Sequence, residues 1–397
     1  MNGPVLVVEW FHSEADISQA MWDACFPPPL EGRWWYRALE RCGIGDQFQF
    51  IYGLVRMQGQ PVAIVPAFVM NVPITLILPS WLLPAARLIG RVAPALLHQR
   101  TLFVGSPCSD EGAIGTVPGA DRYAVLQCVQ QALHEQARKL NAPMLVWKDF
   151  PASCDNVMEQ LSRSAGMFRI VSFPGTIVDL TGSAKEDYFA ALKAKRRHLL
   201  RKKLRRSVEN VAVDVDVVQQ PDAKSMGEIF GLFWQTYQKA TTKFERLNRQ
   251  FFDLIAREPQ SHFIMLRESS TGKLVAFMLC FAFHDHVINK FIGIDYQRPK
   301  EWYLYFRLWE AVLGWSYSRG AQSIQSGQTG YAPKIELGHK IVPLTNHCVH
   351  RNPLIHRIYA AVARTVSWQT LDADLARHIA AHPEVLTSNM PENKPDA

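Results

Sequence analysis

Four stretches in the second half of the chain have hydrophobic patterns that predict β-strands, either alternating apolar and polar residues or short β-rich apolar runs. Val211 to Val218, VAVDVDVV, alternates most strictly and predicts a half-exposed strand. The other three are separated only by short turns and predict an antiparallel meander: His262 to Glu268, Leu274 to Phe283 and Val287 to Ile294. Helical periodicity at Asp222 to Ala240 and at Trp302 to Arg319 surrounds the meander. The pattern therefore predicts a mixed α+β fold.

The first half of the chain has the same mixture of patterns. Phe48 to Arg56 and Pro61 to Met70 are β-rich and flank a short turn, so they predict a hairpin. Two further stretches predict single strands: Pro143 to Phe150 and Ile170 to Leu180. The first of them ends in the charged pair Lys148 and Asp149. Charges at the end of a buried strand either line a cleft or pair with each other, and the sequence leaves both interpretations open.

Positive charge is concentrated in one stretch, Ala190 to Ser207. Nine lysines and arginines lie between Lys193 and Arg206, with no acidic residue among them. The chain has 43 basic and 36 acidic residues, which gives a net charge of +7. Without the nine basic residues of this stretch, 34 basic residues would remain against 36 acidic ones, so this one stretch accounts for the positive net charge. The stretch lacks Gly and Pro and is rich in strong helix formers, which predicts a single basic helix.

Two of these cations fall on the apolar side of the predicted helix. At about 100° per residue, one stripe contains Phe189, Leu192, Leu199 and Leu200. Arg196 and Lys203 point into this stripe. Because an unpaired buried cation is costly, each needs an anionic partner, supplied either by the protein or by a phosphate-bearing ligand. The alternative is a solvated basic face whose side-chain stems cover apolar surface.

An uncharged segment runs from Met57 to Ala86. It is long enough to cross a bilayer, but its five prolines exclude a single spanning helix. We expect a strand, an irregular apolar segment and then a helix from Leu82 to His98, in which arginines are interspersed among apolar residues. Such a helix lies either in the core or on a membrane surface. Residues 72–100 are therefore a candidate for peripheral contact with the inner face of the membrane.

Cysteine usage and the chain ends indicate a cytoplasmic protein. The seven cysteines are scattered and never spaced as C-x-x-C, which predicts reduced thiols, no disulfide framework and no metal site. The N-terminal residues lack the basic start of a signal peptide, and residues 386–397 predict a disordered polar tail. Neither a Gly-x-Ser-x-Gly elbow nor a Walker loop occurs, so hydrolase and ATP chemistry are unsupported. No tightly bound cofactor is expected.

Three features of the second half resemble a known fold. They are the basic run that starts at Lys193, the strand end Gly293-Ile294-Asp295-Tyr296, and the segment Gly330 to Gly338. Together with the order of elements they resemble the acyl-CoA N-acyltransferase (GNAT) fold. More narrowly, they resemble the bacterial Fem-type double-GNAT acyltransferases and their BioF2-like branch. The chain departs from GNAT enzymes between Ile294 and Trp302, where the Gln/Arg-x-x-Gly-x-Gly loop that holds the CoA pyrophosphate is missing.

The resemblance implies tandem GNAT-like domains at residues 1–180, a degenerate copy, and 181–385. It implies an N-acyltransferase that moves an acyl or aminoacyl group to an amine acceptor. The donor is an anionic carrier: acyl-CoA, acyl carrier protein or aminoacyl-tRNA. Nucleic acid is a partner only in the last case. Fem ligases that use tRNA usually have a long coiled-coil insertion, and the sequence shows none.

The resemblance also implies roles for individual residues. Lys334 is the candidate for stabilising the carbonyl or a phosphate, and Tyr331 for donating a proton to the leaving group. Asp149 and Glu245 are candidate bases in a cleft between the halves. The carrier is expected to contact Lys193, Arg196, Arg197, Arg201 and Lys203.

A second class of function stays open. The basic helix and the apolar segment are also typical of a non-catalytic, membrane-peripheral protein that binds anionic lipid. A nucleic-acid-binding protein is the third class, and it predicts a steep salt dependence of binding.

Overall fold

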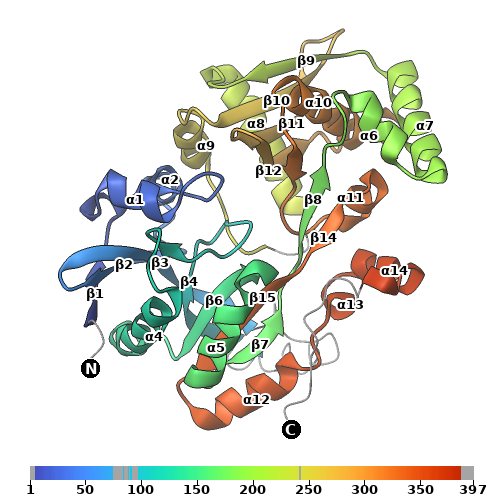
Figure 1. Cartoon of the computed structure of the whole chain (residues 1–397). Coiled ribbons are helices and arrows are strands. Elements are labelled where there is room, and N and C mark those ends of the chain that lie inside the picture. The colour runs from blue at the N-terminus through green and yellow to red at the C-terminus, as the bar shows by residue number, and fades with distance from the viewer. Residues whose placement is uncertain are drawn as a thin grey trace. The chain divides into compact units, whose positions relative to one another are not determined.

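The computed structural model of the chain describes residues 5–74, 97–240 and 243–385, with single positions at 84, 88, 90 and 91. The expected helix from Leu82 to His98 lies largely outside these ranges, and so does the tail at 386–397. The chain divides into two compact units, each with one β-sheet (Figure 1). Unit 1 comprises Met1–Pro174 and Pro343–Ala397, and unit 2 comprises Gly175–Val342.

The sheet of unit 1 has the strand order β1-β2-β3-β4-β6-β15-β7, with β5 paired to β3. Its strands are β1 (Leu6–Phe11), β2 (Gln49–Met57), β3 (Gln60–Pro73), β4 (His98–Val104), β5 (Gly115–Thr116), β6 (Met144–Pro151), β7 (Phe168–Val171) and β15 (Leu344–His350). β4 and β6 run parallel, whereas the other described pairs of this sheet are antiparallel. The predicted hairpin is confirmed, because β2 turns directly into β3.

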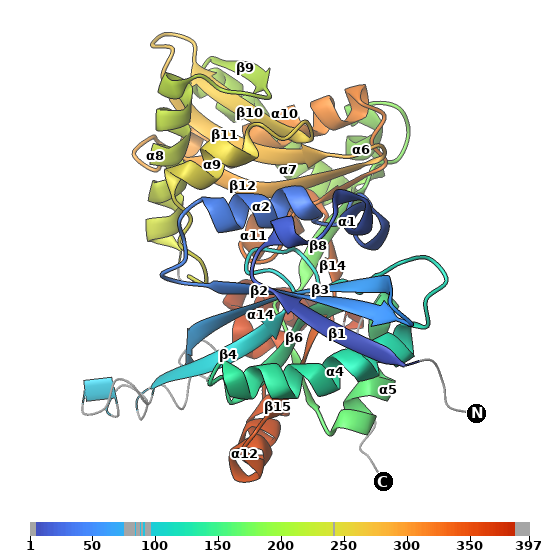
Figure 2. The ribbon, with the colours of Figure 1, turned by 90° about the vertical axis from the view of Figure 1, so that its left-hand side faces the viewer.

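Helices cover both faces of the unit 1 sheet, with α4 on one face and α1 and α2 on the other (Figure 2). The helices of this unit are η1 (Glu14–Asp16), α1 (Gln19–Cys25), α2 (Arg33–Arg41), α4 (Arg122–Lys139), η5 (Ala152–Cys154), α5 (Asp155–Ala165), α12 (Pro353–Ala363), α13 (Trp368–Leu371) and α14 (Ala373–Ala381). Successive strand residues face opposite layers. Ile51 belongs to the core under α4, whereas the ring of Tyr52 lies 5.7 Å from that of Trp22 in α1.

The sheet of unit 2 has the order β14-β8-β13-β12-β11-β10-β9. Its strands are β8 (Gly175–Asp179), β9 (Val213–Val218), β10 (Ser261–Glu268), β11 (Leu274–Ala282), β12 (His286–Ile294), β13 (Ser323–Gln325) and β14 (Lys340–Val342). The predicted meander is confirmed as the antiparallel strands β10, β11 and β12. β13 joins β12 in parallel.

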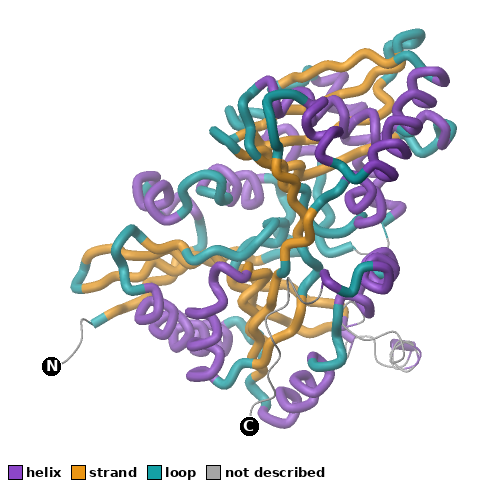
Figure 3. Tube along the Cα trace, turned by 45° about the vertical axis from the view of Figure 1, so that its right-hand side comes forward, coloured by secondary structure: helices purple, strands orange, loops and turns teal. Residues whose placement is uncertain are grey.

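Helices also flank the unit 2 sheet, as the secondary-structure colouring of Figure 3 shows. They are α6 (Lys185–Ala191), α7 (Ala194–Asn210), α8 (Ala223–Lys239), α9 (Arg249–Ile255), η6 (Lys300–Trp302), α10 (Leu304–Ser318) and α11 (Tyr331–Leu337). α10 packs with α6 and α7 over one hydrophobic core. On α8 and α9 the contacts are aromatic, with Phe233 and Phe252 ring centroids 4.8 Å apart.

The two halves of the chain exchange a strand. The sequence predicted one strand from Ile170 to Leu180, but Pro174, which has no backbone N–H, separates β7 in one sheet from β8 in the other. In return, the chain passes from β14 in unit 2 to β15, which lies between β6 and β7 in unit 1. The segment from Pro343 therefore belongs to unit 1, whereas we expected residues 181–385 to form one domain.

The basic stretch is two helices rather than one. α6 ends at Ala191 and α7 begins at Ala194, with Lys193 in an extended conformation (ψ 139°) between them. Most of the expected stripe nevertheless forms, because Phe189, Leu192 and Leu200 pack in one hydrophobic core. Leu200 and Leu204 are buried in α7, but Leu199 is 49% exposed. The mixed fold class is confirmed.

Gly293 in β12 allows α8 to approach the sheet closely. A Cβ there would lie 2.7 Å from the backbone of Leu232 and Phe233. We expect Gly293→Ala to destabilise unit 2 by about 1–3 kcal/mol, because the backbone of a packed helix cannot move aside cheaply. Gly231→Ala in α8, where nothing lies within 4 Å of the new methyl group, is the control and should be neutral or stabilising by up to about 1 kcal/mol. Urea unfolding curves of both variants test this.

Candidate active site

Each unit contains one pair of parallel strands that diverge at their carboxyl ends. β4 and β6 pair from Thr101 to Val104, and β12 and β13 pair over three residues from His286 to Ile288. Beyond the paired residues, the polar groups of the diverging strands need other partners. The carboxyl ends of adjacent parallel strands are also where open α/β sheets bind ligands. Lys334, Tyr331 and Asp149 lie near these two places, whereas the predicted carrier-binding cations lie in and next to α7.

In unit 2 the divergence is filled by a buried polar cluster around Ser326. The Ser326 hydroxyl accepts a hydrogen bond from Asn289 Nδ2 at 3.1 Å and lies 3.2 Å from His339 Nε2. His339 Nδ1 lies 3.0 Å from the carbonyl oxygen of Lys334, which only accepts, so Nδ1 carries the proton. Nε2 is then free to accept the Ser326 hydroxyl proton. Burial, reinforced by Lys334, lowers the pKa of His339 to about 3.

Lys334 holds the loop that follows β13. Its ammonium group donates to the carbonyl oxygens of Ser326, of Gly327 at 3.1 Å and of Gln328 at 3.3 Å. The expected partner of Lys334 was a substrate carbonyl or phosphate, but here it stabilises protein carbonyls. Tyr331 has no exposed surface, and its ring centroid lies 5.9 Å from Lys334 Nζ. The structure therefore brings the two residues together as a support for this loop.

α7 is attached to the same loop through α11. Lys203 pairs with Glu336 and lies 4.2 Å from the centroid of the Phe306 ring. At the end of α11, a Cβ on Gly338 would lie 3.3 Å from the Arg196 guanidinium. The anionic partner that the sequence demanded for Lys203 thus comes from the protein, 133 residues away in the chain. Lys203 is thus paired within the protein in this arrangement.

The outward face of α7 is a basic groove. Its hollow, about 560 Å³, is lined by Ala194, Arg197, His198, Arg201, Lys202 and Arg205. Arg197 also donates to the carbonyl oxygens of Ala190 at 2.8 Å and Leu192 at 3.3 Å, which fixes the start of α7. Within the described part of the chain, Arg201, Lys202 and Arg205 have no acidic partner. Lys193, also expected to contact the carrier, is exposed just before this face.

The loop after β12 is closed around a carboxylate. Asp295 is 2% exposed and accepts hydrogen bonds from the Gln297 amide at 3.1 Å and from Arg298 Nε at 3.2 Å. Lys273 lies 3.4 Å from the same carboxylate. A pyrophosphate-binding loop presents backbone N–H groups to its ligand. In this loop the N–H group of Gln297 donates to the protein's own Asp295 carboxylate instead. The geometry agrees with the absence of the glycine-rich motif from the sequence.

In unit 1, Asp149 occupies a strained position at the end of β6. Its φ is +58°, its N–H donates to Asn346 Oδ1 at 2.7 Å, and it is 2% exposed. Lys148 donates to one carboxylate oxygen and Ser172 to the other. Of the two interpretations left open by the sequence, the structure shows pairing between Lys148 and Asp149. Such outliers persist only where the surroundings enforce them.

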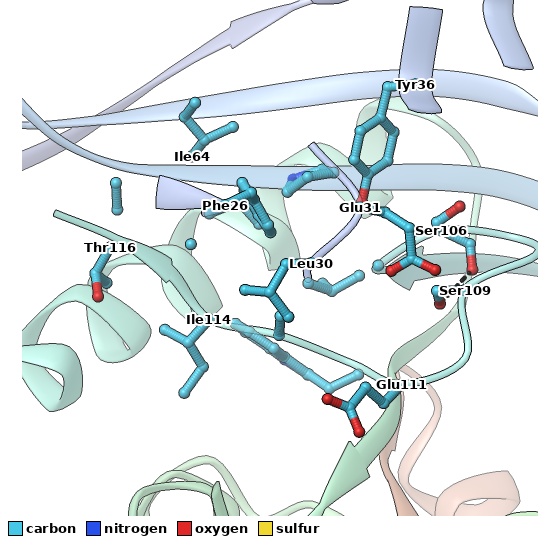
Figure 4. A pocket seen from close by; sticks show the side chains of 18 of the residues that line it. Phe26, Leu30, Glu31, Tyr36, Ile64, Ser106, Ser109, Glu111, Ile114 and Thr116 are labelled. Carbon is cyan, nitrogen blue, oxygen red and sulfur yellow. Dashed lines mark hydrogen bonds between the residues drawn. The ribbon is translucent and has the colours of Figure 1, made fainter. Parts of the chain in front are cut away.

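A small pocket of about 30 Å³ lies where β4 and β6 diverge in unit 1 (Figure 4). Apolar walls come from Phe26, Leu30, Ile64, Val104, Ile114 and Trp147. The charged lining residues are two carboxylates, Glu31 and Glu111. Figure 4 shows the hydroxyl end of Tyr36 pointing toward Glu31. Tyr36 is 4% exposed, and burial together with Glu31 raises its pKa well above the usual value, so its phenol stays neutral.

Sequence reasoning found some of these groups and missed others. Glu245 is half-buried in unit 2 near Tyr237, and Asp149 lies in unit 1. Ser326 and His339 were missed, although the turn formers of the loop 326–330 and the glycine before His339 marked the region. Glu31 and Tyr36 were missed because their approach to residue 111 depends on the packing of α2 over the sheet.

The family model described as peptidoglycan biosynthesis/recognition, FemAB-like, matches residues 118–371. The chain belongs to the FemAB-like family. No curated protein matches it in sequence. The predicted Fem-like, double-GNAT membership is thereby confirmed, whereas the BioF2-like branch stays a prediction. Family and fold together support an acyltransferase. Among the described residues of this FemAB-like protein, no helix has the length and apolar character needed to cross a membrane.

Solved structures share the tandem fold at low sequence identity. The crystal structure of FemX is 9% identical and superposes with a TM-score of 0.55, covering 89% of this chain and 100% of FemX. A tandem GNAT protein from the clavulanic acid biosynthesis pathway is 12% identical with a TM-score of 0.52, covering 88% and 99%. The C-terminal domain of a lysylphosphatidylglycerol synthetase from Agrobacterium fabrum is 16% identical, with coverages of 75% and 84% and a TM-score of 0.48.

The buried histidines predict acid sensitivity. The folded protein keeps His339 and His347 neutral, with pKa values lowered to about 3, whereas unfolding restores their ordinary values near 6.5. Their contribution is complete above pH 6.5 and is lost as the pH falls toward 3, at up to about 1.4 kcal/mol per pH unit for each.

Urea unfolding of the wild type and of His339→Gln between pH 7 and pH 5 tests this. The variant should lose stability less steeply on acidification, since glutamine does not titrate. Equal slopes would contradict the assignment of His339 as a neutral, buried group.

Proposed function

We propose that this FemAB-like protein transfers an acyl or aminoacyl group from a polyanionic carrier to an amine, and that the groove of α7 binds the carrier. The observation that carries this proposal is the row of basic side chains on α7 without acidic partners in the described residues. Unpaired cations in a groove attract phosphates or carboxylates. α7 is joined to α11 by the Lys203–Glu336 pair, so the groove belongs to the element that supports the Ser326 loop.

The spacing of the charges favours an extended carrier. From Arg197 to Arg205 the helix rises about 12 Å, so these groups contact several phosphates in a row rather than one. The closed loop at Asp295 lacks the amide groups that would hold the CoA pyrophosphate. Both features favour a nucleic-acid-borne donor over free acyl-CoA. An acidic acyl carrier protein is the remaining donor compatible with the groove.

The pocket of unit 1 suits the amine acceptor. An ammonium group fits a cavity of about 30 Å³ and is complementary to the carboxylates of Glu31 and Glu111. The Tyr36 phenol oxygen adds a neutral acceptor. Glu31 is the proposed acceptor for the proton that the amine loses before attack on the carbonyl. Lys334 and His339 are positioning residues that keep the loop after β13 in shape.

Charge reversal in the groove tests donor binding. Arg201→Glu with Arg205→Glu should weaken binding of total tRNA and make the dependence of log K on log salt less steep by about 2. The double variant Lys224→Glu with Lys300→Glu has the same net charge and changes exposed lysines of unit 2 outside the groove. Filter binding at several salt concentrations, with coenzyme A and acyl carrier protein as competitors, identifies the class of carrier. If both double variants lost the same amount of tRNA affinity, the groove would be excluded as the binding site.

Amine recognition is tested with n-butylammonium and its neutral analogue butan-1-ol. Glu31→Gln should weaken binding of n-butylammonium about tenfold or more, because it removes a charge-assisted hydrogen bond, and leave butanol binding unchanged. Tyr36→Phe should have a smaller effect of the same sign. Glu135→Gln on the exposed side of α4 is the control. Ligand-observed NMR titration measures both ligands, and no effect of Glu31→Gln would remove the pocket from the mechanism.

A further inference from the structure

The outward face of α12 in unit 1 is apolar. The helix packs inward through His356, whose ring centroid lies 5.1 Å from that of Phe168, and through Tyr359, whose ring lies 5.7 Å from His350. On the opposite side Leu354 is 65% exposed and Ile358 is 52% exposed, and Ala361 is exposed beside them. At about 100° per residue these three positions lie within one narrow stripe. Large apolar side chains this exposed on one helix face indicate a contact surface.

Arginines lie in and next to this helix. Arg357 in α12, and Arg351 and Arg364 just beyond its two ends, are exposed, and none has an acidic partner within the residues that the structure describes. The sequence contains no Asp or Glu from Leu337 to Leu371. An apolar stripe flanked by cations is the pattern of a helix that lies in the plane of a membrane interface, with the arginines at the level of the lipid headgroups.

We propose that the outward face of α12 docks unit 1 on a lipid bilayer that contains anionic lipid. Charge complementarity selects this occupant. A second copy of the chain, docked about a two-fold axis, would bring the same unpaired arginines together. A nucleic acid would leave Leu354 and Ile358 without an apolar partner. A bilayer that contains anionic lipid offers partners to the apolar residues and to the arginines. Leu354 and Ile358 enter the boundary of the acyl chains, while the arginines meet anionic headgroups.

This surface differs in kind from the groove of α7. The two exposed apolar residues of α7, Leu199 and Val208, lie on opposite sides of that helix at about 100° per residue, so they form no common stripe. α7 therefore presents charge without an apolar face, and α12 presents both. The proposed membrane docking through α12 does not depend on the proposed carrier binding by α7. An experiment can therefore disprove one of the two proposals and leave the other intact.

Flotation with vesicles tests the proposal on the full chain. The wild type should float with vesicles of equal parts phosphatidylcholine and phosphatidylglycerol, and much less with phosphatidylcholine alone. Leu354→Ser with Ile358→Ser should reduce the partition coefficient by at least about tenfold. Arg357→Gln and Arg364→Gln should each reduce it by about fivefold on the anionic vesicles. All four positions are on the surface, so the variants are expected to fold.

One control variant and one further measurement separate the possible outcomes. Leu199→Ser with Val208→Ser removes exposed apolar side chains from α7 and should leave flotation unchanged. The proposal is overturned if the α12 variants float like the wild type, or if this α7 double variant abolishes flotation instead. It is also overturned if the α12 double variant changes the oligomeric state measured by light scattering, since the face would then bind a second copy.

Discussion

Two neighbouring parallel strands in each unit separate after a few residues, and the polar backbone groups that this leaves without a strand partner must be satisfied in another way. In unit 2 the carbonyl groups after β13 are taken by Lys334 and by Thr176, whose hydroxyl donates to Ser326 O at 2.9 Å. In unit 1 the left-handed φ of Asp149 directs its N–H to Asn346. Lys334 and Asp149, two of the predicted site residues, are among the groups that meet this requirement.

This requirement also separates the charges. The cluster around Ser326 is buried, and His339 within it is neutral. Cations without an acidic partner among the described residues, such as Arg201 and Arg205, lie on the outward face of α7. Unit 1 has the opposite character at its own strand divergence, where Glu31 and Glu111 line the pocket. The groove and the pocket thus have charges complementary to the polyanionic donor and the amine proposed above.

The two sheets of this tandem GNAT fold exchange strands. β8 follows β7 in the chain but joins the sheet of unit 2, and β15 follows β14 but joins the sheet of unit 1. Truncation after Pro174 would remove β15 from the first sheet, so neither unit corresponds to a continuous half of the sequence. The FemAB-like match across residues 118–371 spans this exchange.

The sequence by itself determined the mixed fold class, the hairpin of β2 and β3 and the meander of β10 to β12, because period-two patterns and turn residues are local. It also located the charge, since nine basic residues stand in one run. Only the tertiary structure decided which cations are free: Lys203 meets Glu336 from a distant part of the chain, whereas Arg201 and Arg205 do not meet an acid among the described residues. The break at Lys193 left Leu199 exposed while Phe189, Leu192 and Leu200 share one core. The pocket of Tyr36 and Glu111 exists only because distant segments pack together.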